Sequence, residues 1–352
     1  MATMKEIAEK AGVSTATVSH VVNGTKQLTP ATTKRVQEVM RELGYRPKKS
    51  FLAQHPLRCK VIGVLVEDMC CFPVPDILCG ISEALEPFGY HILLHNMHLY
   101  DIIYNQYEMI GAYREQVNQE VGVLLDAKVE GIIYVAIHDR HLDGLLDPVS
   151  CPVTYAYSLG SSRDFFVTYG NKESATEIAR CLIARGHHRI AIIAGHPHSF
   201  PTMKRLSGFQ IALQEAGLTI PDGFLAYGNW EYESGYKKTV DLLKLPELPT
   251  AVFAMNDAMA AGCLHALLDN GLRVPEDVSL IGFDNREICE YLRPKLTTIE
   301  LPVREIGRQA GNLVMEQIAS QDDEPRSIIL PCKLVERDSV AAPTQAGIPE
   351  SL

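Results

Sequence analysis

The chain has 352 residues, 46% of them hydrophobic and 22% charged, and a formal net charge of −10. These values are ordinary for two or three soluble domains and exclude a wholly disordered chain, a collagen-like repeat and a small disulfide scaffold. No apolar stretch approaches the roughly eighteen residues of a membrane span, and the charged start MATMKEIAEK lacks the apolar core of a signal peptide, so we expect a cytoplasmic protein.

The charge is divided unevenly along the chain. Residues 1–60 hold eleven Lys and Arg but only four acidic residues, so the remaining chain is strongly acidic. A basic segment on an acidic body is typical of nucleic-acid binding, because neutralising phosphates releases counterions. The alternative is a solvated N-terminal tail that happens to be basic.

The apolar spacing of the basic segment predicts three short helices, over residues 4–11, 15–22 and 30–43. Ser14 is a natural N-cap for the second helix, and Thr29 is one for the third, which starts at Pro30. Gly44 and Pro47 end the third helix. Two helices joined by a tight turn at Gly12 form a helix-turn-helix, whose second helix enters the DNA major groove.

The predicted recognition helix, 14–23, has small or polar outward residues that allow close approach to phosphates and base edges. The alternative is that its Ser and Thr residues only cap the helix or face water. The DNA-binding residues that we expect in the head and hinge are Thr3, Ser14, Thr15, Ala16, Thr17, Ser19, His20, Asn23, Thr25, Tyr45, Arg46 and Leu52.

The stretch TMKEIAEKAGVSTATVSHVVNG at 3–24, continued by Tyr45-Arg46-Pro47, closely resembles the lactose/purine repressor (LacI/GalR) family of bacterial transcription regulators. The resemblance extends to about residue 340. It implies a helix-turn-helix DNA-binding head over 1–47, a hinge over 48–60, and a two-lobed, periplasmic-binding-protein-like core over 61–340 that binds an effector and dimerises. The last residues, 341–352, are predicted to be a disordered tail.

In the hinge, relatives insert a leucine between base steps of the minor groove, a known bending device. This hinge departs from the usual pattern, with Phe51, Leu52 and Ala53 followed by Gln54 and Pro56. Either Leu52 or Phe51 is the candidate wedge; alternatively, both pack against the head or the core. A wedge predicts that Leu52→Ala weakens operator binding far more than binding to random DNA.

From residue 60 onward, short apolar runs alternate with amphipathic helices, which predicts an α/β core of doubly wound parallel sheets. The predicted strands are 61–66, 90–94, 131–136, 153–157, 189–194, 251–254 and 278–283. The resemblance implies two lobes with three crossings, one of about 61–160 plus 293–320 and the other of about 161–292 plus 321–340.

Ligands of such sheets bind beyond the carboxyl ends of the strands. The candidate effector-binding residues, most of which follow strands, are Phe72, Tyr157, Arg205, Trp230, Asn256 and Asp284. Planar donors and acceptors suit sugar hydroxyls, and aromatic faces suit the C–H surface of a sugar.

In sugar-sensing relatives the positions matching Arg205, Trp230, Asn256 and Asp284 contact the effector, so the resemblance implies the same here. Relatives commonly have Asp where Tyr157 stands, and nucleobase-sensing relatives have Arg and Thr in the loop that reads Ser199-Phe200-Pro201, which disfavours a purine. Structural alternatives stay open: Asn256 caps a helix, Asp284 is a turn residue, Trp230 is plain core, or Arg205 pairs with a surface acid.

The chain also departs from the family around 100–114, where roughly a dozen extra residues carry four tyrosines at near-helical spacing, Tyr100, Tyr104, Tyr107 and Tyr113. Such an insertion covers the cleft, extends the dimer surface or binds a partner. The alternative, which the spacing favours, is a longer surface helix with its tyrosines packed down.

Neither a metal site, another cofactor nor an enzyme is expected. His91, His95 and His98 fall on and around a predicted strand, where a four-residue spacing does not bring side chains together. The phosphate-binding, nucleophile-elbow and dinucleotide motifs are missing from the sequence. The nine cysteines, without paired motif spacing, are expected to be reduced thiols.

The sequence therefore predicts a dimeric DNA-binding regulator, most simply a repressor of a palindromic operator, controlled by a small effector that is a sugar or a sugar derivative. The alternatives are a carbohydrate-binding protein without DNA function, a regulator responding to another metabolite such as a nucleobase, and a sugar-modifying enzyme.

Overall fold

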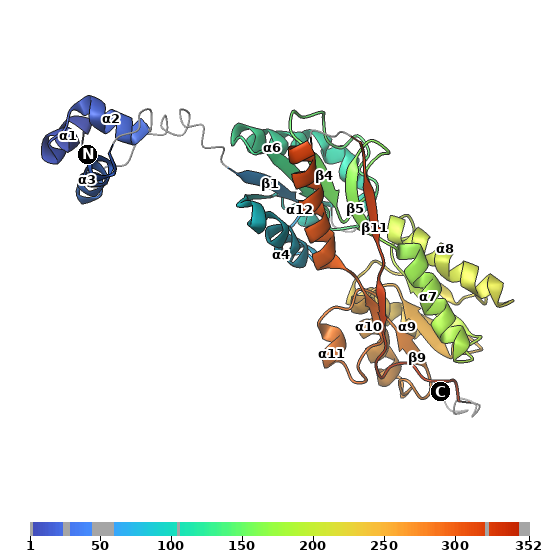
Figure 1. Ribbon diagram of the computed structural model, residues 1–352. Helices are drawn as coiled ribbons and strands as arrows, with labels where there is room; N and C mark the ends of the chain where they lie inside the picture. Colours follow the sequence, from blue (N-terminus) through green and yellow to red (C-terminus); the bar gives the residue numbers. More distant parts are fainter. Residues whose placement is uncertain (1–2, 24–28, 44–59, 104–105, 321–323, 345–352) are drawn as a thin grey trace. The chain divides into compact units, whose positions relative to one another are not determined.

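A computed structural model describes residues 3–23, 29–43, 60–103, 106–320 and 324–344, in two compact units (Figure 1). The first unit ends at residue 59 and the second begins at Lys60. No helix in these ranges is both long and apolar enough to cross a membrane.

The first unit contains three helices, at nearly the predicted positions: α1 (Met4–Ala11), α2 (Thr15–Asn23) and α3 (Pro30–Glu42). The predicted caps of α2 and α3 are confirmed, since the Ser14 hydroxyl accepts a hydrogen bond from the Thr17 amide at 3.1 Å and the Thr29 hydroxyl accepts one from the Thr32 amide at 3.3 Å. The apolar faces of the helices share one small core of Ile7, Ala8, Ala11, Val18, Val36 and Val39. The helix-ending Gly44 and Pro47, and the hinge to residue 59, lie outside the described residues.

The second unit has two lobes, each built on a parallel sheet. The sheet of the first lobe contains, in spatial order, β2 (His91–Asn96), β1 (Val61–Val66), β3 (Gly131–Val135), β4 (Val153–Ala156), β5 (Phe165–Tyr169) and β11 (Ser327–Leu330). The helices and turns of this lobe are α4 (Val74–Leu85), the short 3₁₀ helix Glu86–Phe88, α5 (Tyr100–Ile103), the 3₁₀ helix Tyr107–Tyr113, α6 (Arg114–Asp126) and α12 (Val303–Ser320).

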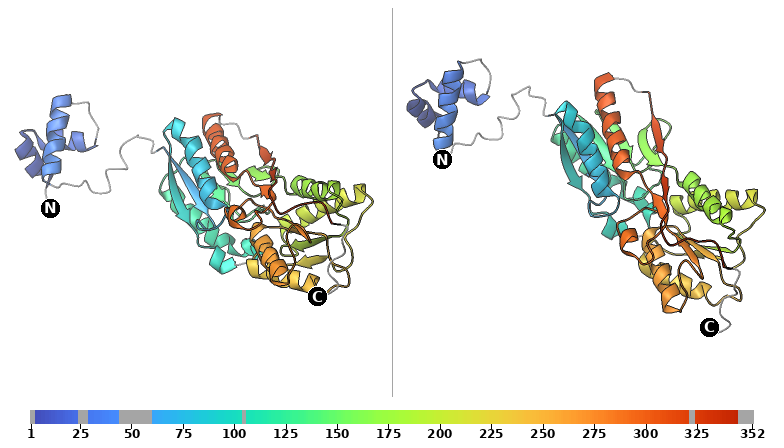
Figure 2. Two further views of the ribbon diagram at one scale, coloured as in Figure 1. Left: turned by 90° about the horizontal axis from the view of Figure 1, so that it is seen from below. Right: turned by 60° about the horizontal axis from the view of Figure 1, so that its bottom comes forward.

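Helices cover both faces of the first sheet. A Cβ atom at Gly63 would point at Leu124 of α6, whereas one at Gly131 would point at Val314 of α12. Because Gly131 pairs with Ile62, the neighbour of Gly63, these two directions are opposite faces of the sheet. Helix α4 packs along α12 (Figure 1, Figure 2). The continuous apolar composition of β1 and β3 follows from burial on both sides.

The second lobe repeats this arrangement with a four-stranded parallel sheet, β7 (Leu225–Tyr227), β6 (Ile190–Ala194), β8 (Ala251–Ala254) and β9 (Ser279–Ile281). Its helices are α7 (Asn171–Ala184), α8 (Phe200–Glu215), α9 (Tyr232–Leu242), α10 (Asp257–Asp269) and α11 (Ile288–Tyr291). The helices pack as two pairs, α7 with α8 and α9 with α10. An antiparallel pair, β10 (Thr298–Glu300) and β12 (Lys333–Val335), adjoins β9.

The division of the chain between the lobes differs from the expected one at three places. Strands β5 and β11 belong to the first sheet although we expected them in the second lobe, and the segment before Val303, including β10, lies beside β9 although we expected it in the first. The first lobe is therefore 61–169 plus 303–330. The short connection from β4 to β5 contains no helix, so the sequence pattern did not show that β5 continues the same sheet.

The tyrosine spacing favoured one long helix over 100–114, and this expectation is wrong. The segment forms the single turn α5 and, from Tyr107 to Tyr113, a 3₁₀ helix, with residues 104–105 outside the described ranges. Tyr100 and Tyr113 are half-buried, and the side chains of Tyr104 and Tyr107 are not among those described. Buried Leu99, Ile103 and Ile110 attach the segment to the core of the first lobe.

The first residues of the predicted disordered tail are ordered instead. The Ala341 amide donates to the Ser279 hydroxyl at 3.0 Å, and the Ala341 carbonyl lies 2.8 Å from Nε2 of His187. The Thr344 hydroxyl donates to the Glu276 carbonyl at 3.2 Å. These bonds continue the chain along β9, which the polar, small-residue composition after Ala341 does not reveal. Residues 345–352 lie outside the described ranges.

Candidate functional site

The head presents part of the predicted DNA-binding set on its surface. Thr15 and Ala16 are exposed at the start of α2, and Ser19 and His20 are half-buried on the same helix. Thr3 forms a capping box with Glu6 at the start of α1. The Ser14 hydroxyl caps the helix by accepting a hydrogen bond from the Thr17 amide, and it lies 2.9 Å from the Thr17 hydroxyl. The side chain of Asn23 and all of Thr25, Tyr45, Arg46 and Leu52 lie outside the description.

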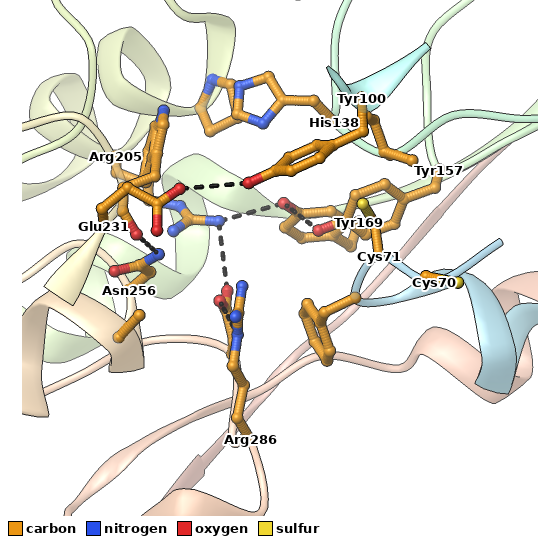
Figure 3. A pocket seen from close by; sticks show the side chains of 16 residues that line it. Cys70, Cys71, Tyr100, His138, Tyr157, Tyr169, Arg205, Glu231, Asn256 and Arg286 are labelled. Atoms are coloured by element: carbon orange, nitrogen blue, oxygen red, sulfur yellow. Dashed lines mark hydrogen bonds and ion pairs between the residues drawn. The ribbon is translucent and has the colours of Figure 1, made fainter. Parts of the chain in front are cut away.

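In the core, one cavity of about 300 Å³ lies between the lobes, and all six residues expected from the sequence line it. They are Phe72 and Tyr157 from the first lobe and Arg205, Trp230, Asn256 and Asp284 from the second. The other lining residues are Cys70, Cys71, Tyr100, Ile137, His138 and Tyr169 of the first lobe and Pro201, Glu231, Ala258 and Arg286 of the second. Figure 3 shows the polar and aromatic side chains converging on this space.

Arg205, on α8, is the central cation of the pocket and is only 3% exposed. Its guanidinium lies 3.5 Å from the ring centroid of Phe283 and donates to Oδ1 of Asn171 at 2.8 Å, to the Tyr169 hydroxyl at 3.1 Å and to the Met255 carbonyl. These contacts hold the guanidinium in one plane at the wall of the pocket. Pairing with an acid on the surface, one alternative from the sequence, is excluded by this burial.

Asp284 lies opposite Arg205 in a left-handed turn, with a backbone φ of 118°. Its carboxylate oxygens lie 4.0 Å from Nη2 of Arg205 and 3.3 Å from Nε of Arg286. Burial raises the pKa of Asp284 above its ordinary value, against the opposing effect of the two arginines. Asp284 is thus a turn residue, as one alternative held, and also a lining residue of the pocket.

Asp257, a neighbour of Asp284, is fully buried and does not line the pocket. Its carboxylate accepts hydrogen bonds from the Thr298 hydroxyl at 2.6 Å and the Arg286 amide at 2.7 Å. Burial and the neighbouring charge of Asp284 raise the pKa of Asp257 to about 7. Asp257 therefore orients the loop that carries Asp284 and Arg286.

Asn256 combines the two roles that the sequence left open. Its Oδ1 accepts from the Met259 amide at 2.8 Å, which caps α10, and its Nδ2 donates to the Trp230 carbonyl at 2.8 Å. The same side chain lines the pocket and fastens the turn of Trp230.

Trp230 packs on Gly195, where a Cβ atom would lie 2.0 Å from the indole ring. The backbone of Trp230 has a φ of 74°, a strained conformation for a bulky residue, and the indole meets the His138 ring edge-on at 5.5 Å. Its Nε1 is buried and has no hydrogen-bond partner within the described residues. Trp230 is therefore a wall of the pocket rather than plain core.

Tyr157, the position at which relatives commonly have Asp, stacks on Tyr169 with ring centroids 5.2 Å apart and hydroxyls 3.3 Å apart. Burial raises the pKa of both hydroxyls, so both remain protonated donors at neutral pH. The tyrosine pair presents two hydroxyl groups at the pocket, and that of Tyr169 accepts a hydrogen bond from Arg205.

Sequence reasoning missed several lining residues for different reasons. His138 comes shortly after β3, so the rule of strand ends would have found it, whereas Tyr169 is the last residue of β5, a strand that the sequence analysis did not predict. Arg286 lies two residues after Asp284 in the same loop, and its guanidinium stands 4.5 Å from the ring of Phe72 in the other lobe. Tyr100 and Glu231 are 131 positions apart and come into contact only in the folded protein, so no local sequence pattern predicts their hydrogen bond.

In the part of the chain that the structure describes, no three His, Cys, Asp or Glu side chains are grouped to hold an ion. Among the histidines considered from the sequence, His95 instead pairs with Glu120 of α6 at 2.8 Å.

Comparison with known proteins gives two family matches. Residues 3–48 match bacterial regulatory proteins of the lacI family, and residues 179–340 match the periplasmic binding protein-like domain. The chain is 32% identical to the HTH-type transcriptional repressor PurR of Vibrio atlanticus (strain LGP32), over 97% of this chain and 99% of the relative.

Two solved structures are similar over nearly the whole chain. The lac repressor dimer bound to operator and the anti-inducer ONPF has 25% identity and a TM-score of 0.77, over 97% of this chain and 99% of that one. The complex of the transcriptional regulator CelR with cellobiose has 28% identity and a TM-score of 0.65, over 96% of this chain and 100% of that one.

Proposed function

The chain belongs to the lacI family of bacterial regulatory proteins and is a DNA-binding transcriptional repressor with a small-molecule effector, and from this premise we propose that the effector is a sugar or sugar derivative bound between the two lobes. Binding of the effector changes the relation of the lobes and with it the affinity of the head for its operator. The proposed division is a head over 1–47, a hinge over 48–60 and a core over 61–340.

The observation that carries the proposal is the mixture of chemical groups that line one cavity. Arg205 and Arg286 supply donors, Asp284 and Glu231 supply acceptors, and Trp230 supplies a flat apolar wall. A sugar presents hydroxyls that both donate and accept at its rim, and C–H bonds on its faces. A ligand with only one of these characters leaves buried polar groups of this pocket unpaired, which costs binding free energy.

The Arg205–Asp284 spacing supports the same ligand class. At 4.0 Å the two groups are too far apart for a direct hydrogen bond, so a hydroxyl between them accepts from the guanidinium and donates to the carboxylate. Within the described part of the chain, neither Nη group of Arg286 has a hydrogen-bond partner, which leaves further donors for the effector.

A nucleobase is the second candidate, because the PurR relatives match almost the full chain. The local chemistry is less suited to it. In the loop where nucleobase-sensing relatives are expected to have Arg and Thr, Pro201 lines the pocket without a donor, and the Ser199 hydroxyl caps α8 through the Thr202 amide at 3.4 Å.

For the DNA side we propose a homodimer, whose two recognition helices α2 sit about one helical turn of DNA apart, ~34 Å, on a palindromic operator. The residues proposed to contact DNA are those on and around α2 together with Leu52 in the hinge. The basic composition of residues 1–60 supplies the phosphate contacts, so operator affinity falls steeply with rising salt.

Operator binding by the full-length protein, measured with a panel of sugars, sugar derivatives and nucleobases, tests the proposal. A sugar that changes operator affinity about tenfold, with Arg205→Ala abolishing the change, supports it. A response to a nucleobase alone replaces the sugar by the second candidate. If no compound in the panel alters operator affinity, the effector proposal fails.

A further inference from the structure

The segment around 100–114, which the sequence analysis expects to be an insertion, reaches the pocket through Tyr100. Its start is bonded to the end of β1: the Met97 amide donates to the Val66 carbonyl at 2.9 Å and the Leu99 amide to the Glu67 carbonyl at 2.8 Å. Leu99 is completely buried in the first lobe. The next residue, Tyr100, therefore projects from a fixed point of that lobe, and it lines the cavity.

Tyr100 crosses the cavity to the second lobe. Its hydroxyl donates to Oε1 of Glu231 at 3.2 Å, a bond between residues 131 positions apart in sequence (Figure 3). Glu231 is held from its own side, because its amide donates to Oδ1 of Asn229 at 3.2 Å and its carbonyl accepts from the Ser234 hydroxyl at 2.8 Å. Both partners are thus fixed to different lobes, and any opening of the lobes separates them.

We propose that Tyr100 and Glu231 form a latch across the pocket that closes behind the effector and slows its departure. The proposal rests on the function proposed above and adds a gate that the insertion supplies. Both side chains are half-buried, so water replaces the hydrogen bond when the latch opens, and the net free-energy difference is small enough for an effector to change the balance.

The other contacts between the lobes either lie at a crossing of the chain or involve rings. Arg205 of the second lobe donates to the Tyr169 hydroxyl at 3.1 Å, but Tyr169 ends β5, from which the chain passes directly to α7 of the second lobe, whereas Tyr100 follows β2 at the far edge of the first sheet. Arg286 lies over the ring of Phe72, and His141 meets Phe200 edge-on with ring centroids 5.1 Å apart. Ring contacts of this kind tolerate sliding, whereas the hydroxyl–carboxylate bond requires a narrow range of distance and angle. Of these contacts, the Tyr100–Glu231 bond is the hydrogen bond remote from the crossing after β5, so it is sensitive to the angle between the lobes.

The single tryptophan of the chain makes the latch measurable without any effector. Trp230 precedes Glu231 and lines the pocket, so quenching of its fluorescence by acrylamide reports how open the pocket is. Tyr100→Phe, Glu231→Gln and the double variant are compared with wild type in the full-length protein. Tyr291→Phe is the matched control, because Tyr291 also donates to a glutamate, Glu287, but in an exposed contact outside the pocket.

We expect each latch variant to shift the opening equilibrium about fivefold, which corresponds to about 1 kcal/mol for a net hydrogen bond. The quenching constant then rises in both variants, the double variant equals either single one, and the control matches wild type. Tyr100→Phe is decisive because it acts from the opposite lobe and leaves the residues beside Trp230 unchanged. Quenching constants equal to wild type in Tyr100→Phe and Glu231→Gln overturn the latch.

With a responsive effector in hand, the dissociation rate gives the second readout. Tyr100→Phe is expected to release the effector about fivefold faster while the association rate changes little. Unchanged dissociation rates reject the latch but leave the sugar-responsive repressor standing. Absence of any effector response in wild type rejects the proposed function, whereas the fluorescence experiment still decides the latch.

Discussion

The guanidinium of Arg205 and the carboxylate of Asp284 face each other at 4.0 Å inside the core, while the direct hydrogen bonds of Arg205 go to Asn171, Tyr169 and the Met255 carbonyl. The cation is therefore positioned by neutral partners, and its charge is only partly balanced by the acid. Such an arrangement prevents a direct hydrogen bond between the two charged groups, so both remain able to bind a ligand.

Replacing Arg205 by Lys tests this positioning. A lysine keeps the charge but loses the planar contact with Phe283 and most of the three hydrogen bonds. We expect the unfolding free energy of the core to fall by about 2 kcal/mol and the effector response to be lost. Urea unfolding and effector titration measure the two effects. Arg180→Lys is the control, because Arg180 pairs with Glu215 on the surface; equal losses in both variants contradict the assignment.

Gly195→Ala tests the seat of Trp230. The added methyl group would lie 2.0 Å from the indole, so the ring must leave its position or β6 must shift. We expect a changed emission maximum, loss of the effector response and a destabilisation of about 1–3 kcal/mol. The matched substitution Gly122→Ala adds its methyl group to open space on α6 and should change none of these properties.

The pH dependence of stability should depend on Asp139. This residue is buried below Arg205, accepting hydrogen bonds from Thr168 at 2.8 Å and Asn171 at 2.6 Å, and burial raises its pKa to about 7. Between its unfolded pKa near 4 and pH 7 the folded state binds more protons than the unfolded state. Asp139 therefore contributes stability that is fully present at low pH and is lost as the pH rises through 7.

Asp139→Asn removes this titration while retaining a similar shape. Between pH 5 and pH 7 we expect the unfolding free energy of wild type to fall by about 1–2 kcal/mol relative to the variant, as measured by urea unfolding at each pH. Asp126→Asn, at the exposed end of α6, shows the effect of removing a surface carboxylate. Parallel pH curves for wild type and Asp139→Asn would be inconsistent with the raised pKa.

The N-cap of the recognition helix gives a prediction for the head. Ser14→Ala removes the acceptor of the Thr17 amide, which should destabilise α2 by about 1 kcal/mol. Hydrogen exchange of the α2 amides should therefore accelerate about fivefold, and operator affinity should weaken. Thr15→Ala, one position into the helix and exposed, should leave amide protection unchanged even if it weakens DNA binding. Equal exchange rates in Ser14→Ala and wild type would contradict the claim that the Ser14 cap stabilises α2.

The sequence by itself determined what depends on neighbouring residues. The caps at Ser14 and Thr29 and the apolar spacing placed all three head helices, because capping and amphipathic patterns act within a few residues. The seven predicted strands are present for the same reason. The strand-end rule, together with the family resemblance, placed six residues on one cavity, since parallel strands bring their carboxyl ends to the same edge.

Only the tertiary structure decided which distant segments meet. Strands β5 and β11 join the first sheet, Ala341 extends along β9, and Arg286 reaches Phe72 across the lobes, although none of these segments signals its partner locally. The bond between Tyr100 and Glu231 depends on the angle between two separately folded lobes. Pairings of this kind follow from how whole sheets and lobes pack, and the periodicity of a single segment contains no information about that packing.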